Sequence, residues 1–178
     1  MKTQSKIYKM VLSAMFLALA MVLPFLTGQI PQIGKALSPM HIPVFLAGFF
    51  VGPVYAALIG FVAPLLRAVL FGMPALFPNA TAMAFELATY GAVSGLLYKA
   101  LPNKKINIYL SLIGAMLAGR IVWGAVMFFL MGIGKAEFGI EKFLAVGFIN
   151  AVPGIILHIV LVPILVMALR RYTIKNNQ

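Results

Sequence analysis

Apolar residues fill long stretches of this chain, and polar residues interrupt them at a few places. A helix needs about 20 apolar residues to cross the hydrocarbon core of a bilayer, which is about 30 Å thick. The pattern therefore predicts an all-α integral membrane protein, a single domain over residues 1–178 with six transmembrane helices. The predicted helices are residues 10–26, 41–51, 54–71, 79–101, 108–131 and 143–169.

The first long connection, residues 27–39, contains two prolines, two glycines and Lys35, a composition typical of loops. The helix that follows it, over residues 41–51, is too short to cross a bilayer core by itself. We therefore expect part of this loop to lie within protein at membrane depth. It is a candidate lid, with Gln29, Lys35 and His41 as its candidate residues.

Composition agrees with a membrane protein, because 63% of the residues are hydrophobic and only three are acidic. The net charge of +11 could indicate a nucleic-acid partner. Most lysines and arginines, however, lie at helix ends and in loops, where the orientation of the protein in the membrane explains them. With the amino terminus inside, the basic segments predict that both termini are cytoplasmic.

Several chemistries are excluded by missing residues. The chain contains no cysteine and no aspartate, and it has no P-loop sequence. Thiolate metal sites, cysteine nucleophiles, aspartate dyads and ATP hydrolysis by this chain are therefore excluded. We expect no metal and no cofactor in this chain, whereas an enzyme based on serine and histidine remains open.

Arg67 and Glu86 stand inside predicted transmembrane helices. A charge at the centre of a spanning helix costs roughly 2.5 to 3.5 kcal/mol, so such residues pair with each other, face a protein interior or bind a ligand. A clamp between Arg67 and Glu86 is one alternative. A ligand site is the other.

Polar and aromatic residues recur at helical spacing on three predicted helices, which places each set on one face. These faces predict an outward-facing pocket. Its candidate substrate-binding residues are Arg67, Asn79, Glu86, Tyr90, Arg120, Trp123, Asn150 and His158. Two arginines against one glutamate leave an excess positive charge, which favours an anionic ligand. A carboxylate suits the planar fork of arginine.

Ala14 and Ala18 share one face of the first helix. Small residues four apart allow another helix to approach closely. Either packing within this chain or docking of a partner would explain them.

The segment HIPVFLAGFFVGPVYAALIGFVAPLLR, residues 41–67, contains a G-P-x-x-[GA]-x-x-x-G pattern from Gly52 to Gly60. Together with the six apolar segments, the long first outer loop and Ala14-x-x-x-Ala18, it resembles the substrate-binding S components of energy-coupling factor (ECF) vitamin transporters. The resemblance extends over nearly the whole chain.

The resemblance implies a multi-pass protein of the bacterial cell membrane with an S-component-like bundle, and a binding subunit rather than an enzyme. It implies that Ala14 and Ala18 dock onto a transmembrane coupling subunit that is shared with two ATPases, which use ATP and Mg. The S component would capture a vitamin outside and then reorient in the bilayer. Nucleic acid is not an expected partner.

Within this family, pantothenate is the best candidate ligand, because it combines a carboxylate, hydroxyls and an apolar dimethyl group. Folate, lipoate, riboflavin, a pyridine or pyrimidine vitamin and a queuosine precursor remain alternatives. Two other classes of function also stay open: a stand-alone secondary transporter of a small organic anion, and an intramembrane enzyme that uses His158 or Glu86.

Overall fold

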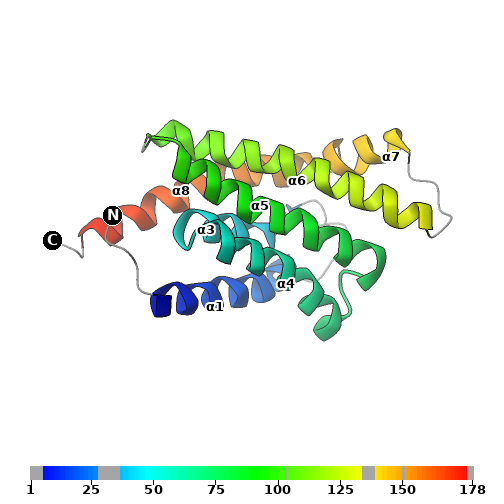
Figure 1. Ribbon diagram of the computed structural model, residues 1–178, viewed down its shortest axis with the longest axis horizontal. Helices are drawn as coiled ribbons and strands as arrows, with labels where there is room; N and C mark the ends of the chain where they lie inside the picture. Colours follow the sequence, from blue (N-terminus) through cyan, green and yellow to red (C-terminus); the bar gives the residue numbers. More distant parts are fainter. Residues whose placement is uncertain (1–5, 28–36, 103, 134–138, 150, 176–178) are drawn as a thin grey trace.

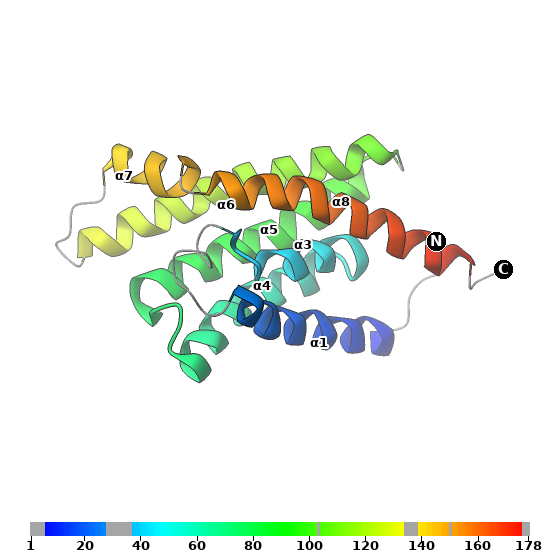
Figure 2. The ribbon, with the colours of Figure 1, turned by 180° about the vertical axis from the view of Figure 1, so that it is seen from behind.

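The computed structural model describes residues 6–27, 37–102, 104–133, 139–149 and 151–175, and within these ranges it contains helices and no strands. An elongated bundle is formed around α3 (His41–Phe50) by the long helices α1 (Lys6–Val22), α4 (Pro53–Phe71), α5 (Thr81–Ala100), α6 (Lys105–Ile133) and α8 (Val152–Lys175) (Figure 1). Helices α4 and α8 lie on opposite sides of the bundle, as the view from behind in Figure 2 shows. The expected all-α class is confirmed.

Successive helices of the bundle alternate in direction (Figure 1). The start of α1, the α5–α6 connection and the end of α8 therefore lie at one end, and the α4–α5 connection lies at the other. Four helical segments within the described residues are long and apolar enough to cross a membrane: Lys6–Leu26, Pro53–Phe71, Lys105–Met131 and Ala145–Arg171. The chain is thus a membrane protein with several candidate spans, and six crossings stay a prediction.

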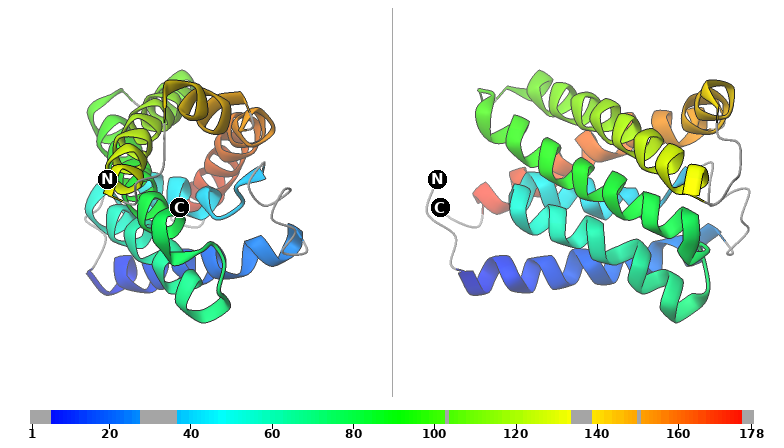
Figure 3. Two further views of the ribbon diagram at one scale, coloured as in Figure 1. Left: turned by 90° about the vertical axis from the view of Figure 1, so that its right-hand side faces the viewer. Right: turned by 45° about the vertical axis from the view of Figure 1, so that its right-hand side comes forward.

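Helix α3 is short and buried, with nine of its ten residues in the interior. It packs against α1, α4, α5 and α8, and it lies between α1 on one side and α6 and α8 on the other (Figure 3). A helix that is apolar all round and surrounded by protein needs neither a lipid-facing stripe nor the length of a bilayer. This explains how a ten-residue helix fits into a transmembrane bundle.

The bounds of α4 follow from local sequence. Gly52 precedes the helix with a φ of 96°, and Pro53 occupies the first turn, where its missing N–H is harmless. At the other end Gly72 adopts the left-handed conformation, and its N–H donates to the Ala68 carbonyl at 2.9 Å. The predicted helix over residues 54–71 is therefore confirmed to within one residue.

Helices α4 and α5 approach closely through small residues. A Cβ atom added at Gly60 would lie 2.3 Å from the Leu87 carbonyl oxygen, and one added at Gly91 would lie 2.5 Å from the Ala56 carbonyl oxygen. Neither backbone could absorb such contacts without a shift of the helix. Ala56 and Gly60, which are four residues apart on α4, therefore form a packing face of small residues against α5.

The expectation of one continuous helix over residues 143–169 is wrong. The segment contains a short helix α7 (Ile140–Leu144), a π-helical turn η3 (Ala145–Ile149) and then α8. Pro153 lies in the first turn of α8 and has no N–H to donate back to Ile149, so the hydrogen-bond ladder cannot continue through this point. Hydropathy does not register the break because the segment stays apolar throughout.

The other predicted helices are present with shifted bounds. Helix α1 begins four residues earlier than predicted and continues into a 3-10 turn, η1 (Leu23–Thr27). The short segment η2 (Leu76–Ala80), which is kinked at Phe77 where the backbone is extended (φ −119°, ψ 134°), precedes α5. Helix α6 begins and ends slightly beyond the predicted residues 108–131.

Candidate functional site

Glu86 is the centre of a buried group of polar side chains between α5 and α6. Its side chain is 2% exposed. The Oε1 atom lies 2.9 Å from Nη1 of Arg120 and accepts a hydrogen bond from the Tyr90 hydroxyl at 2.7 Å. The i, i+4 spacing predicted that Glu86 and Tyr90 share a face of their helix, and this is confirmed.

The ring of Tyr90 is held in place from two directions. A Cβ atom at Gly119 of α6 would lie 2.2 Å from the Tyr90 Cε1 atom, so only glycine leaves room for the ring there. On its other side the ring stacks on Phe45 of α3, with a centroid distance of 4.8 Å. Helices α3 and α6 therefore fix the hydroxyl that orients Glu86.

Two histidines extend this group toward α3 and α8. His41 is the first residue of α3, and its ring centroid lies 5.4 Å from that of Tyr90 and 5.7 Å from that of His158 on α8. Both histidines are 3% exposed. His41 is therefore an interior residue of a helix, and its assignment to the outer lid loop is corrected.

We call His41, Glu86, Tyr90, Arg120 and His158 the polar cluster. It joins four helices that are distant in sequence, and it leaves several polar atoms without a protein partner. Both ring nitrogens of His41 and Nε2 of His158 are buried with no hydrogen-bond partner among the described residues. Leaving such groups unsatisfied costs roughly 1 to 3 kcal/mol each, so the cluster is suited to bind a polar molecule.

Arg67 does not join the polar cluster. Its Nη1 atom donates to the Met21 carbonyl at the end of α1, at 2.7 Å. The guanidinium carbon lies 5.0 Å from the ring centroid of Phe25 and 5.2 Å from that of Phe71, within the range of cation–π contacts. These four residues, Met21, Phe25, Arg67 and Phe71, are called the Arg67 clamp below, and the alternative of a clamp between Arg67 and Glu86 is not what the structure shows.

The remaining candidate binding residues are dispersed. Trp123 is buried with Ala82 and Met127, and its ring lies 6.3 Å from that of Phe143 on α7, in a separate apolar cluster. Asn79 is exposed in η2. Gln29, Lys35 and Asn150 lie outside the described residues.

Ala14 and Ala18 are both exposed on α1, whereas Phe16 and Ala20 of the same helix are buried in the bundle. The pair therefore takes no part in the buried face of α1. Of the two explanations, packing within the chain is not supported by the position of these residues.

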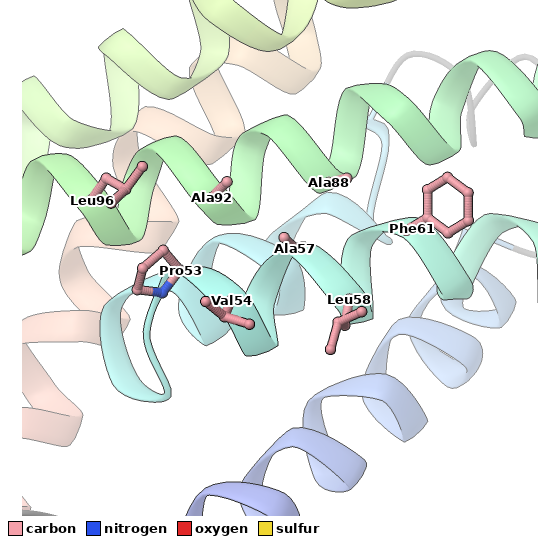
Figure 4. A pocket seen from close by; sticks show the side chains of 8 residues that line it. All are labelled: Pro53, Val54, Ala57, Leu58, Phe61, Ala88, Ala92 and Leu96. Atoms are coloured by element: carbon pink, nitrogen blue, oxygen red, sulfur yellow. The ribbon is translucent and has the colours of Figure 1, made fainter.

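An apolar groove of about 490 Å³ runs along the outer face between α4 and α5 (Figure 4). It offers no polar side chain to a ligand. Its lining residues are Pro53, Val54, Ala57, Leu58, Phe61, Ala88, Ala92 and Leu96. The groove does not include any residue of the polar cluster, so it is unsuited to bind a charged ligand and fits the surface expected toward lipid.

The residues described by the structure contain no group of three or more histidine, cysteine, aspartate or glutamate side chains able to hold a metal ion. Sequence reasoning missed three contributors to the site: His41 as an interior group, Phe45, and Gly119 beneath Tyr90. The four-residue spacing of His41 and Phe45 is a signal that could have placed both on one face of their helix.

The fold and the polar cluster define the class of this protein. It is an integral membrane protein of bundled helices, with a buried polar cluster in which some nitrogen atoms have no hydrogen-bond partner among the described residues. The chain matches the family of ECF transporter substrate-specific components over residues 8–169, and it belongs to that family. Searches among curated proteins and among solved structures find no match. Members of the family are substrate-binding subunits of transporters, so this chain is a transport subunit that works with coupling and ATPase subunits.

Proposed function

We propose that this subunit captures a small vitamin or vitamin precursor that carries a carboxylate, and that pantothenate is its substrate. The observation that carries the proposal is the geometry of Arg120. Its guanidinium makes a single described contact, from Nη1 to Glu86, and its side chain is 13% exposed. Arginine has five N–H donors, so most of them stay available for the oxygens of a carboxylate.

The surroundings of Arg120 fit the rest of such a molecule. His41 and His158 provide ring nitrogens for hydroxyl groups, and the Phe45 ring, 5.7 Å from His158, provides an apolar surface for a dimethyl group. Glu86 and Tyr90 are occupied with Arg120 and with each other, so their role is to orient the guanidinium. Asn79, Trp123 and Asn150 stay as proposed contributors from the sequence.

The orientation that we propose has both termini in the cytoplasm. One end of the bundle collects the start of α1, the α5–α6 connection and the end of α8 (Figure 1). The basic residues of these segments are Lys6, Lys9, Lys99, Lys104, Lys105, Arg170 and Arg171. Cytoplasmic loops carry an excess of lysine and arginine, which supports this orientation and an outer face at the opposite end.

We further propose that α1 contacts the coupling subunit through Ala14 and Ala18. Their exposure supports this role, because small side chains on an outer helix face permit close helix packing in a bilayer.

The test is to purify the chain with its transporter partners and to weigh any retained ligand by native mass spectrometry. Binding of pantothenate is then compared with binding of pantothenol, in which an alcohol replaces the carboxylate, by the fluorescence of the single tryptophan, Trp123. We expect pantothenate to bind at least about tenfold more tightly, since one charge-assisted hydrogen bond contributes about 1.5 to 3 kcal/mol.

Equal binding of the two compounds would contradict an anionic substrate. If no vitamin of a broad panel bound and no coupling subunit copurified, the whole proposal would fail. Uptake into vesicles by this chain without ATPases would instead support a stand-alone carrier.

A further inference from the structure

The apolar groove between α4 and α5 covers only the half of these helices that lies toward the end of the bundle where α5 ends (Figure 4). This end, with its lysines and arginines, is called the basic end below. The groove runs along α4 from Pro53 to Phe61 and along α5 from Leu96 back to Ala88. Each of these stretches rises about 12 Å, and one leaflet of a typical hydrocarbon core is about 15 Å deep. The groove therefore matches the acyl chains of a single leaflet in length.

The groove has small side chains along its middle and aromatic rings at the end farthest from the basic end. Ala57, Ala88 and Ala92 are half-buried between the two helices (Figure 4). The rings of Phe61 on α4 and Phe85 on α5 meet edge to face, with their centroids 5.5 Å apart. Because this pair bridges the two helices, an extended apolar chain that lies in the groove ends against these rings.

A cation lies on the same face at the basic end. Lys99 belongs to the last turn of α5 and is exposed. It follows Ala92 by seven residues and Ala88 by eleven, and these spacings place it on the helix face that lines the groove. The acidic residue nearest to it in sequence, Glu86, is buried and paired with Arg120. The charge of Lys99 is therefore available to an anion at the membrane surface.

The orientation of the protein accounts for the number of basic residues at this end, but it does not require any of them to share a face with a groove. We propose that the groove binds an acyl chain of an anionic phospholipid and that Lys99 contacts the phosphate of the same lipid. Basic residues next to a membrane surface attract anionic lipids, whereas the cation of a choline headgroup offsets the phosphate charge. This lipid site goes beyond the proposed function, because it does not depend on which vitamin binds.

The test is a lipid titration of the full chain in detergent, read out by native mass spectrometry. The probes are dioleoylphosphatidylglycerol and dioleoylphosphatidylcholine, which have the same acyl chains and differ in headgroup charge. We expect the first phosphatidylglycerol molecule to bind about fivefold more tightly than the first phosphatidylcholine. Lys99→Gln should remove this preference. Lys105→Gln, which removes a charge at the same end but on α6, is the matched control and should keep it to within about twofold.

A second pair of variants tests the groove itself. Ala92→Leu fills the middle of the groove and should weaken binding of both lipids by about fivefold, because the acyl chain loses its apolar contacts. Ala125→Leu makes the same change at an exposed alanine of α6 and should leave lipid binding unchanged. Thermal unfolding of each variant is the folding control.

Equal binding of the two lipids by the wild type, equal losses in the two lysine variants or undiminished binding to Ala92→Leu would overturn the proposal. A benzophenone-bearing amino acid at Leu96 tests the occupant in the assembled transporter in a membrane. It should crosslink to phospholipid, and a crosslink to the coupling subunit instead would show that a protein helix covers the groove. Vitamin binding is measured separately, so failure of the lipid site leaves the proposed function unaffected.

Discussion

The Arg67 clamp and the polar cluster each place one arginine among apolar helices, and they satisfy it by different means. Arg67 meets a backbone carbonyl and the faces of two phenylalanine rings. Arg120 meets the carboxylate of Glu86 and lies near two imidazoles that have unpartnered nitrogens. The first arrangement fastens α4 to the end of α1, whereas the second leaves hydrogen-bonding capacity unused.

The difference teaches that a charge within a membrane helix is not by itself a sign of a binding site. Contacts with the rest of the protein can offset the free-energy cost of a charge inside the membrane, so no ligand is needed to explain it. The informative feature is the presence of neighbouring polar atoms that the protein leaves unsatisfied. By this criterion the polar cluster is the region that we propose to bind the substrate, and the Arg67 clamp supports the helix that we expect to face the coupling subunit.

The largest expected effect is on transport, and it separates the exposed face of α1, the helix that the Arg67 clamp supports, from the polar cluster. Replacing Ala14 and Ala18 together by tryptophan should abolish ATP-driven uptake and leave vitamin binding unchanged, because both residues are exposed and distant in sequence from the polar cluster. Uptake into proteoliposomes and binding in detergent are measured on the same preparations. Ile121→Trp, on an exposed face of α6, is the matched control and should transport normally. Loss of binding in the double variant would return these alanines to a structural role.

The next effect concerns the stability of the polar cluster. Glu86→Gln leaves the Arg120 charge without its acid and should lower the free energy of unfolding by about 3 to 5 kcal/mol. Thermal unfolding of the substrate-free subunit measures the loss. Adding Arg120→Met should recover a large part of it, since the uncompensated charge is then removed. A double variant as unstable as the sum of the single ones would show that the pair is not coupled.

A smaller effect is expected on affinity. Arg120→Met should weaken pantothenate binding by about 1.5 to 3 kcal/mol and leave the weak binding of pantothenol almost unchanged, because only the carboxylate loses a charge-assisted bond. Titration of both compounds against the same variant measures the difference. Parallel losses for the two compounds would indicate a collapsed site.

The smallest effect on binding is expected at Arg67, which is the matched control for Arg120. Arg67→Met removes one hydrogen bond and the cation–π contacts, so it should reduce stability by about 1 to 2 kcal/mol. Pantothenate affinity should change by less than about twofold. If Arg67→Met and Arg120→Met weakened binding equally, both arginines would belong to the binding site and the distinction drawn above would be lost.

Much of the architecture could be predicted from the sequence, because helix periodicity places residues on faces. The pairing of Glu86 with Tyr90 and the small face of α4 at Ala56 and Gly60 follow directly from four-residue spacing. The break between η3 and α8 could not be obtained from hydropathy, since both sides are apolar. Pro153 was the local signal for it.

The candidate site was predictable only in part. The spacing of residues shows on which face of its helix Arg67 lies, but it does not show in which direction the long side chain extends. In the structure this side chain contacts α1 rather than α5. Trp123 follows Arg120 by three residues and contacts α7, whose existence as a separate helix was not predicted. The start of the helix at His41 was predicted correctly, but the sequence does not show that the first turn of α3 is surrounded by other helices, so His41 was assigned to the lid although it is buried.

The shortness of α3 has a consequence for the path of the substrate. Ten residues of helix rise about 15 Å, which is half the thickness of a typical hydrocarbon core. Helix α3 ends toward the same end of the bundle as α5 and α8 (Figure 1), so His41, its first residue, is set back from that end by the length of the helix. In the orientation that we propose, a vitamin bound between His41 and Arg120 would lie about half of the way across the hydrocarbon core before any ATP is hydrolysed.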